Sequence, residues 1–174
     1  MARAEHPDAI ALLKSDHRKV EELFEQFENA SGKARKEKIA HQICTELKIH
    51  AQIEEEIFYP ACEGKIEEDL LAEAYVEHDG AKVLINEIEA GSADEQFYDA
   101  KVKVLKEQIE HHVEEEEKRM EGMFSQARKA GLDMDALGEQ LQARKDELMA
   151  QAESAGLPPA TPTTLHEGPA AGMQ

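Results

Sequence analysis

The sequence predicts an all-α protein: an up-down-up-down four-helix bundle followed by an additional C-terminal helix and a disordered tail. Three observations favour this fold class. Long stretches rich in Glu, Lys, Leu and Ala carry apolar residues at helical spacing, proline is scarce before residue 158, and short glycine-containing segments separate the stretches. Each such helix has one apolar stripe to bury, and short loops make consecutive helices antiparallel neighbours.

The first two helices are predicted from their apolar periodicity and from the breaks that follow them. The first helix starts near Pro7, which suits a first helical turn, and ends at Ser31-Gly32. The second helix spans about residues 33–60 and ends before Gly64. Both stretches are long enough to cross the whole bundle.

The third and fourth helices follow the same pattern. A third helix starts near Glu67 and ends at Gly91. Ser92 and Glu95 then have the spacing of a capping box, in which the side chains of the two residues satisfy backbone N–H groups at a helix start. The fourth helix is therefore predicted as one long element over about residues 93–129.

The chain divides into three parts: the bundle at residues 1–130, an accessory C-terminal helix at 131–155 and a disordered tail at 156–174. Asp133 can cap the accessory helix. The apolar face of this helix either docks on the bundle, mediates self-association or binds a protein partner. The tail is rich in Pro, Thr, Gly and Ala, a composition typical of disorder.

The charge of the chain excludes several classes of partner. There are 38 acidic and 20 basic residues, a formal charge of −18, which repels nucleic acid and anionic lipid. No stretch approaches the roughly 20 apolar residues of a membrane span. Cys44 and Cys62 form no CxxC motif, and the N-terminus lacks the apolar run of a signal peptide, so a cytoplasmic location is expected.

Each helix of the predicted bundle carries a histidine where its apolar stripe should continue, and two helices add a glutamate one turn later. These polar residues at core positions are His17, His50, Glu54, His78, His112 and Glu116. The i, i+4 spacing places histidine and glutamate on one helical face. Burying an ionised carboxylate without a partner costs several kcal/mol, and no Lys or Arg shares these stripes. The two carboxylates therefore need cations.

The mixture of imidazole and carboxylate groups predicts the kind of metal and the number of ions. Such ligands favour iron, manganese or zinc over calcium or magnesium. Six ligands exceed one tetrahedral zinc site, whereas two metals with two imidazoles each and two shared carboxylates use all six. The remaining histidines lie off the stripes, and Glu21 is left out because Val20 takes the core position of that turn.

The segments around these residues resemble the four signature segments of hemerythrin-like HHE domains over about residues 9–124. The segments are Asp16-His17, His50-Ala-Gln-Ile-Glu54-Glu55-Glu56-Ile-Phe-Tyr-Pro60, Glu77-His78 and His112-Val-Glu-Glu-Glu116-Glu117. The resemblance implies a non-haem centre of two iron ions with an oxo or hydroxo bridge, four terminal histidine ligands and two bridging glutamates. Ferritin-like di-iron proteins use Glu-x-x-His instead, and no histidine of this chain has that spacing.

One departure from the family bears on function. Oxygen-carrying hemerythrins place two histidines one turn apart on the third helix, whereas Ala74 and Lys82 flank His78 here. Tyr75 is close enough to supplement the site, although a core position is the favoured interpretation. A four-histidine centre favours binding or sensing of dioxygen, peroxide or iron. A di-iron oxidoreductase that consumes peroxide, iron storage or buffering, and a purely structural or partner-binding bundle stay open as alternatives.

Overall fold

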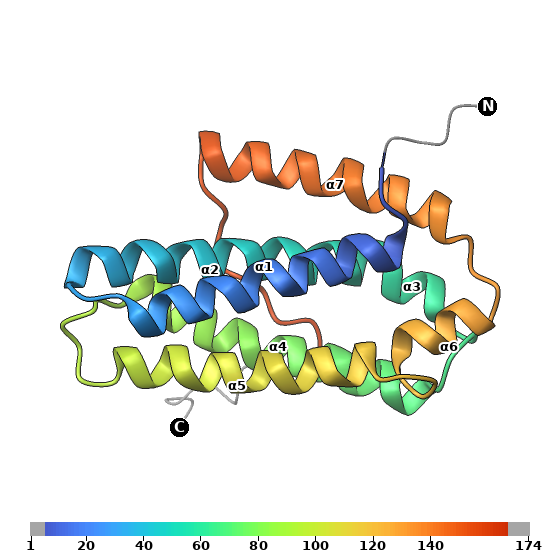
Figure 1. Ribbon diagram of the computed structural model, residues 1–174, viewed down its shortest axis with the longest axis horizontal. Coiled ribbons are helices and arrows are strands. Elements are labelled where there is room, and N and C mark those ends of the chain that lie inside the picture. The colour runs from blue at the N-terminus through green and yellow to red at the C-terminus, as the bar shows by residue number, and fades with distance from the viewer. Residues whose placement is uncertain (1–5, 167–174) are drawn as a thin grey trace, which may run out of the picture.

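The computed structural model describes residues 6–166, and within this range it contains helices and no strand. The bundle consists of α1 (Ala9–Asn29), α2 (Lys33–Ile53), α4 (Glu68–Ala90) and α5 (Tyr98–Glu117). Helix α2 packs against α1 and α4, and α5 packs against α4 and α1, so the four helices close a ring (Figure 1). The predicted all-α bundle is confirmed. Over residues 6–166, no helix has both the length and the apolar character needed to cross a membrane.

Polar residues divide the core of the bundle into two apolar parts. One apolar cluster includes Val20, Leu47 and Ile85, and the other includes Leu13 and Phe58. The predicted histidine layer lies between them. On α1, α2 and α4 the histidine lies at the boundary between the residues of the two clusters, and on α5 it follows the residues of one cluster. The polar layer is therefore covered by apolar packing at both ends of the bundle.

The second predicted helix changes its geometry at the metal-binding motif. After α2 the chain forms a π-helix, η1 (Glu54–Phe58), and a short α3 (Tyr59–Cys62). The backbone N–H of Tyr59 bonds to the carbonyl of Glu54, five residues earlier. The extra residue in this turn carries Tyr59 into the core. Ile57, which a regular α-helix would place on the core stripe three residues after Glu54, is only partly buried.

The predicted fourth helix is two helices rather than one, which corrects both its start and its continuity. It does not begin at residue 93, because the Ser92 hydroxyl donates to Glu37 of α2 instead of capping a helix. After α5 the chain turns at residues 118–122, where Met120 has a φ of 70°. A Cβ on Gly122 would lie 2.5 Å from the backbone oxygen of Lys118, so this turn requires glycine. Helix α6 (Met123–Lys129) follows.

The accessory helix is α7 (Met134–Ser154), and the Asp133 side chain caps it as predicted by accepting from the backbone of Ala136. It docks on α1, α2 and η1 along the outer side of the bundle (Figure 1). Leu141 and Leu148 are buried in that contact. Gly138 allows the helix to approach the start of α1, since a Cβ there would lie 2.5 Å from the backbone oxygen of Pro7.

The segment after α7, predicted to be disordered, has no helix or strand up to residue 166 but follows a defined course over α2 and α4 (Figure 1). We call residues 157–165 the strap. The side chain of Asn86 donates to the carbonyl of Ala160 and accepts from its N–H, both at 2.8 Å. Lys48 donates to the carbonyl of Pro158 at 3.1 Å. Side chains of the bundle thus satisfy the strap backbone, a possibility that composition does not reveal. Residues 167–174 lie outside the described residues.

The close approach of α7 predicts the effect of substituting Gly138. Gly138→Ala forces backbone atoms of α7 and α1 apart, so we expect the free energy of unfolding to fall by about 1–3 kcal/mol. Urea unfolding followed by circular dichroism measures this change. Gly80→Ala is the matched control: its Cβ would lie 3.7 Å from the Gln108 side chain, and we expect a neutral or slightly stabilising effect. Equal stability of the two variants would contradict the proposed close contact.

Candidate metal centre

The structure brings all six predicted metal-binding residues together in the polar layer of the bundle. All six are buried, and Glu54 is fully inaccessible to solvent. They form two groups, in each of which the potential ligand atoms lie within 4.8 Å of one another: His17, His50, Glu54 and Glu116, and Glu54, His78 and His112. Glu54 belongs to both groups. Glu116 also faces both, since its Oε1 lies 3.3 Å from Nε2 of His112.

Each of the four histidines points Nε2 toward the centre and Nδ1 toward a carboxylate. The Nδ1–oxygen distances are 2.7 Å for His17–Glu117, 3.0 Å for His50–Asp16, 3.1 Å for His78–Glu55 and 2.8 Å for His112–Glu77. An ionised carboxylate can only accept a hydrogen bond, so each Nδ1 carries a proton and donates it. Nε2 is left facing the centre, which is the orientation that outer carboxylates impose on histidine ligands of metals.

These outer carboxylates connect the helices in a closed ring. Asp16 of α1 holds His50 of α2, and Glu55 of η1 holds His78 of α4. Glu77 of α4 holds His112 of α5, and Glu117 of α5 holds His17 of α1. Each carboxylate is the sequence neighbour of one candidate ligand and the hydrogen-bond partner of the next. Helix packing and ligand orientation are therefore set by the same contacts.

Three of the carboxylate oxygens at the centre lack hydrogen-bond donors. Glu54 Oε1, Glu54 Oε2 and Glu116 Oε1 are buried and have no hydrogen-bond partner within residues 6–166. Although Nε2 of His50 lies 2.5 Å from Glu54 Oε1, no hydrogen-bond geometry joins the two atoms. The Nε2 atoms of His78 and His112 are 3.1 Å apart, so at most one of them can carry a proton. Buried acceptors in this number require positive charge, and the residues present fit metal cations.

The pKa values of the site show that its buried carboxylates and imidazoles compete for protons. Burial and then the charge of Glu116 raise the pKa of Glu54 to about 7. Burial lowers the pKa of His78 to about 4, so its imidazole is neutral. Burial also opposes the charged form of His112, but the neighbouring Glu116 outweighs it and raises the pKa of His112 to about 10. A metal ion that binds here therefore displaces protons from the site.

Tyr59 is a site residue that the sequence reasoning missed. Its hydroxyl lies 3.1 Å from Nε2 of His78 and 3.2 Å from Nε2 of His112, and donates to Oε2 of Glu116 at 3.1 Å. Tyr75, which the sequence places close enough to supplement the site, packs edge-on against the Tyr59 ring at 5.1 Å between centroids.

The local sequence does contain one signal for this arrangement. Pro60 follows Tyr59 and has no backbone N–H, so it cannot donate to the carbonyl four residues earlier as an α-helix requires. That missing bond makes a wider turn over residues 54–58 less costly. Periodicity alone assumes a regular helix and places residue 59 off the stripe.

Comparison with known proteins identifies the family. The sequence profile of the hemerythrin HHE cation-binding domain matches residues 8–124 of this chain, which is more than half of its length. The chain belongs to the hemerythrin HHE family. Within this HHE protein, α7 and the strap lie beyond the matched residues.

Two individual proteins are similar to this HHE protein. A hemerythrin HHE cation-binding domain-containing protein from Mycobacterium kansasii has the same fold, with a TM-score of 0.71 and 22% identity over 87% of this chain and 95% of that one. A protein from Nostoc sp. named DNA nickase is 29% identical over 106 residues, or 61% of this chain. The match covers only 30% of the length of that relative.

The unpaired carboxylate oxygens predict opposite effects of one substitution with and without metal. Glu54→Gln removes a buried charge and provides an amide N–H beside Nε2 of His50. We therefore expect the free energy of unfolding of the metal-free protein to rise by about 1–3 kcal/mol. Stabilisation by added metal should be lost. Denaturant unfolding after chelator dialysis, and again after metal loading, measures both effects.

Glu56→Gln is the matched control for this substitution. Glu56 is the exposed second neighbour of Glu54 and pairs with Arg144 of α7. We expect a change below about 1 kcal/mol in either state, since exposed ion pairs contribute little. Destabilisation of the metal-free protein by Glu54→Gln would contradict the unpaired state of this carboxylate.

Proposed function

We propose that this HHE protein holds a non-haem di-iron centre that binds or senses a small oxygen species, dioxygen or peroxide. His17 and His50 would hold one ion, His78 and His112 would hold the other, and Glu54 and Glu116 would be shared between the two positions. The observation that carries this proposal is the pair of facing imidazole sets around buried carboxylate oxygens that have no donor. Iron held there would supply electrons to the oxygen species.

Tyr59 places a hydroxyl group beside the second proposed metal position. The four-histidine set lacks the additional histidine of oxygen-carrying hemerythrins on the third bundle helix, where Lys82 follows His78 by one turn. The Tyr59 hydroxyl lies within 3.2 Å of Nε2 of both His78 and His112. The Tyr59 hydroxyl therefore places a hydrogen-bond donor beside His78 and His112, in the half of the site where the additional histidine is missing.

A small apolar cavity beside the four histidines favours a small uncharged ligand. Its volume is about 30 Å³, which holds one or two atoms of the size of a water oxygen. Aliphatic side chains form most of its wall: Val20, Leu47, Ala81, Ile85, Ile109 and Val113. Dioxygen or hydrogen peroxide fits this space, whereas an organic substrate does not.

Metal content tests the central part of the proposal. We expect about two iron ions per chain by elemental analysis of protein made in iron-replete cells. His17→Ala and His78→Ala should each lose at least one ion, because each removes one of the two imidazoles at its position. His41→Ala, on the exposed side of α2, is the control and should keep both ions.

The possible outcomes separate the alternatives. One ion per chain, or zinc in place of iron, would contradict the bridging roles of Glu54 and Glu116. Many more than two ions would support iron storage instead. A protein without metal would leave the helical bundle without this function.

Peroxide consumption is a second candidate, favoured by the proton on Tyr59. Burial and then the charges of Glu116 and Glu54 raise the pKa of this phenol well above its usual value, so it keeps its proton inside the site. Reduction of hydrogen peroxide to water takes two electrons, which the iron ions would supply, and two protons, one of which the Tyr59 hydroxyl can donate. The relative named DNA nickase adds no support for DNA cleavage here, because the match covers 30% of that protein and this chain carries a charge of −18.

Tyr59→Phe distinguishes the two candidates. If the protein consumes peroxide with the phenol as proton donor, we expect the variant to keep its iron but to lose tenfold or more of its turnover of hydrogen peroxide. If the protein binds or senses oxygen, the reduced wild type should oxidise and gain an absorption band in air without sustained peroxide turnover. Tyr98→Phe, in the apolar cluster remote from the site, is the control. Absorption spectroscopy and oxygen-electrode measurements give both readouts.

A further inference from the structure

The part of the chain beyond the HHE domain reaches the outer hydrogen bonds of the candidate metal centre at two points. We propose that Lys145 of α7 and Thr163 of the strap are positioning residues that hold the outward N–H groups of His50 and His78. One of these histidines belongs to each proposed metal position, so the C-terminal extension supports a candidate ligand at both positions. This inference rests on the proposed metal centre.

The first point of support runs from α7 to His50. Nζ of Lys145 lies 2.5 Å from Oδ1 of Asp16. The other oxygen of Asp16, Oδ2, accepts from Nδ1 of His50 at 3.0 Å. Asp16 is buried, and these two groups each hold one of its oxygens. Lys145 therefore fixes the orientation of the carboxylate, and the carboxylate fixes the imidazole ring.

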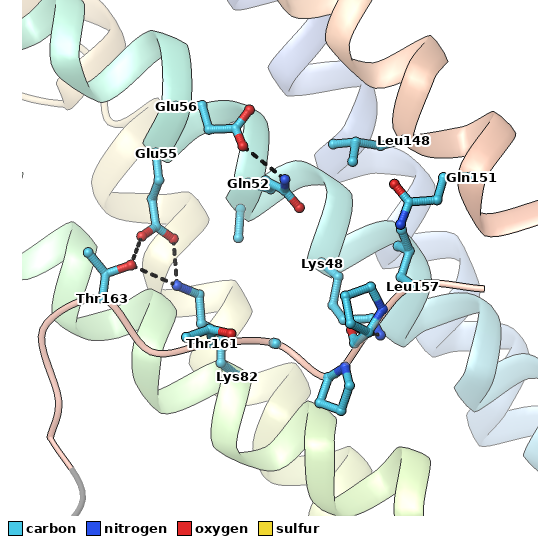
Figure 2. A pocket seen from close by; sticks show the side chains of 14 residues that line it. Lys48, Gln52, Glu55, Glu56, Lys82, Leu148, Gln151, Leu157, Thr161 and Thr163 are labelled. Carbon is cyan, nitrogen blue, oxygen red and sulfur yellow. Dashed lines mark hydrogen bonds and ion pairs between the residues drawn. The ribbon is translucent and has the colours of Figure 1, made fainter. Parts of the chain in front are cut away.

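The second point of support runs from the strap to His78. The Thr163 hydroxyl donates to Oε1 of Glu55. Oε2 of Glu55 accepts from Nδ1 of His78 at 3.1 Å and pairs with Nζ of Lys82 at 2.8 Å. Figure 2 shows Thr163, Glu55 and Lys82 joined in one cluster where the strap passes over the bundle. Thr163 thus holds the free oxygen of the carboxylate that orients His78.

Asp79 keeps Thr163 in place. This fully buried carboxylate follows His78 on α4 and accepts backbone N–H groups from Thr163 at 2.8 Å, Thr164 at 2.5 Å and Leu165 at 2.8 Å. Without the strap, its remaining partner among the described residues is Lys82 at 3.2 Å. Three convergent backbone donors on one buried carboxylate are a strong, directional anchor. The position of Thr163 is therefore fixed by the fold.

The other two outer carboxylates are held from within the HHE domain. Arg18 of α1 pairs with Glu117, which supports His17. His111 of α5 lies 3.1 Å from Glu77, which supports His112. The bundle therefore supplies the outer partners at His17 and His112, and α7 and the strap supply Lys145 and Thr163 at the remaining two histidines.

An open cleft explains why support is needed at His78. The cleft has a volume of about 390 Å³ and lies between the strap, α2, η1 and α7 (Figure 2). Glu55, Lys82 and Thr163 form part of its wall. Glu55 lines this cleft and keeps 11% of its side chain exposed, so solvent that enters the cleft would compete for its oxygens. We therefore expect the Nδ1 proton of His78 to exchange with solvent faster when the Thr163 hydroxyl is removed.

Proton NMR of the cobalt(II)-loaded full chain tests the inference without measuring activity. A histidine bound to cobalt through Nε2 retains an exchangeable Nδ1 proton whose signal is strongly shifted by the metal, so four such signals are expected. Thr163→Val should increase the exchange rate of the His78 signal by about fivefold or more, as for the loss of one hydrogen bond. Lys145→Met should do the same for the His50 signal. Thr163→Ser and Lys145→Arg should restore slow exchange.

Each variant has a matched control. Thr161→Val removes a hydroxyl from the same strap and the same cleft, and Arg144→Met removes the cation that pairs with the exposed Glu56. Both controls should leave all four signals unchanged. If four signals are present and Thr163→Val and Lys145→Met behave like their controls, the inference is wrong while the metal centre stands. If the unsubstituted protein binds no cobalt and gives no shifted signal, both the metal centre and the inference are wrong.

Discussion

Two glutamates buried side by side in an apolar core are the constraint on which the rest of this structure depends. Glu54 and Glu116 are almost wholly inaccessible to solvent, and among residues 6–166 no Lys or Arg side chain lies within ion-pair distance of them. Their charge must be balanced by protons on neighbouring imidazoles or by cations. The helices place four histidines around them, and the apolar clusters on both sides keep water away from the pair.

The ring of outer carboxylates turns this local requirement into a property of the whole bundle. Because each carboxylate lies on one helix and its histidine on the next, a shift of any helix misaligns two candidate ligands. Aromatic packing adds to this fixation, since Phe124 of α6 stacks on the His17 ring at 5.9 Å between centroids. The break after α5 that makes this stacking possible is therefore part of the site as well as of the fold.

Periodicity was sufficient to place the six candidate ligands in the core. It works where the helix is regular, because only there does a fixed number of residues per turn assign each residue to a face. His17, His78 and His112 lie on such helices. Tyr59 lies beyond a π-helical turn, which changes the residue count per turn and moves the side chain to another face. The strap was not predictable either: its composition is that of a disordered segment, and its order depends on Asp79 and Asn86, far away in sequence.

The contact that closes the ring also sets the time at which the centre can form. The hydrogen bond between His17 and Glu117 joins the first and last helices of the bundle, across a sequence separation of 100 residues. Contacts of such separation carry a large entropic cost and form only after the intervening elements are made. A nascent chain on the ribosome therefore presents an incomplete set of candidate ligands until α5 has emerged.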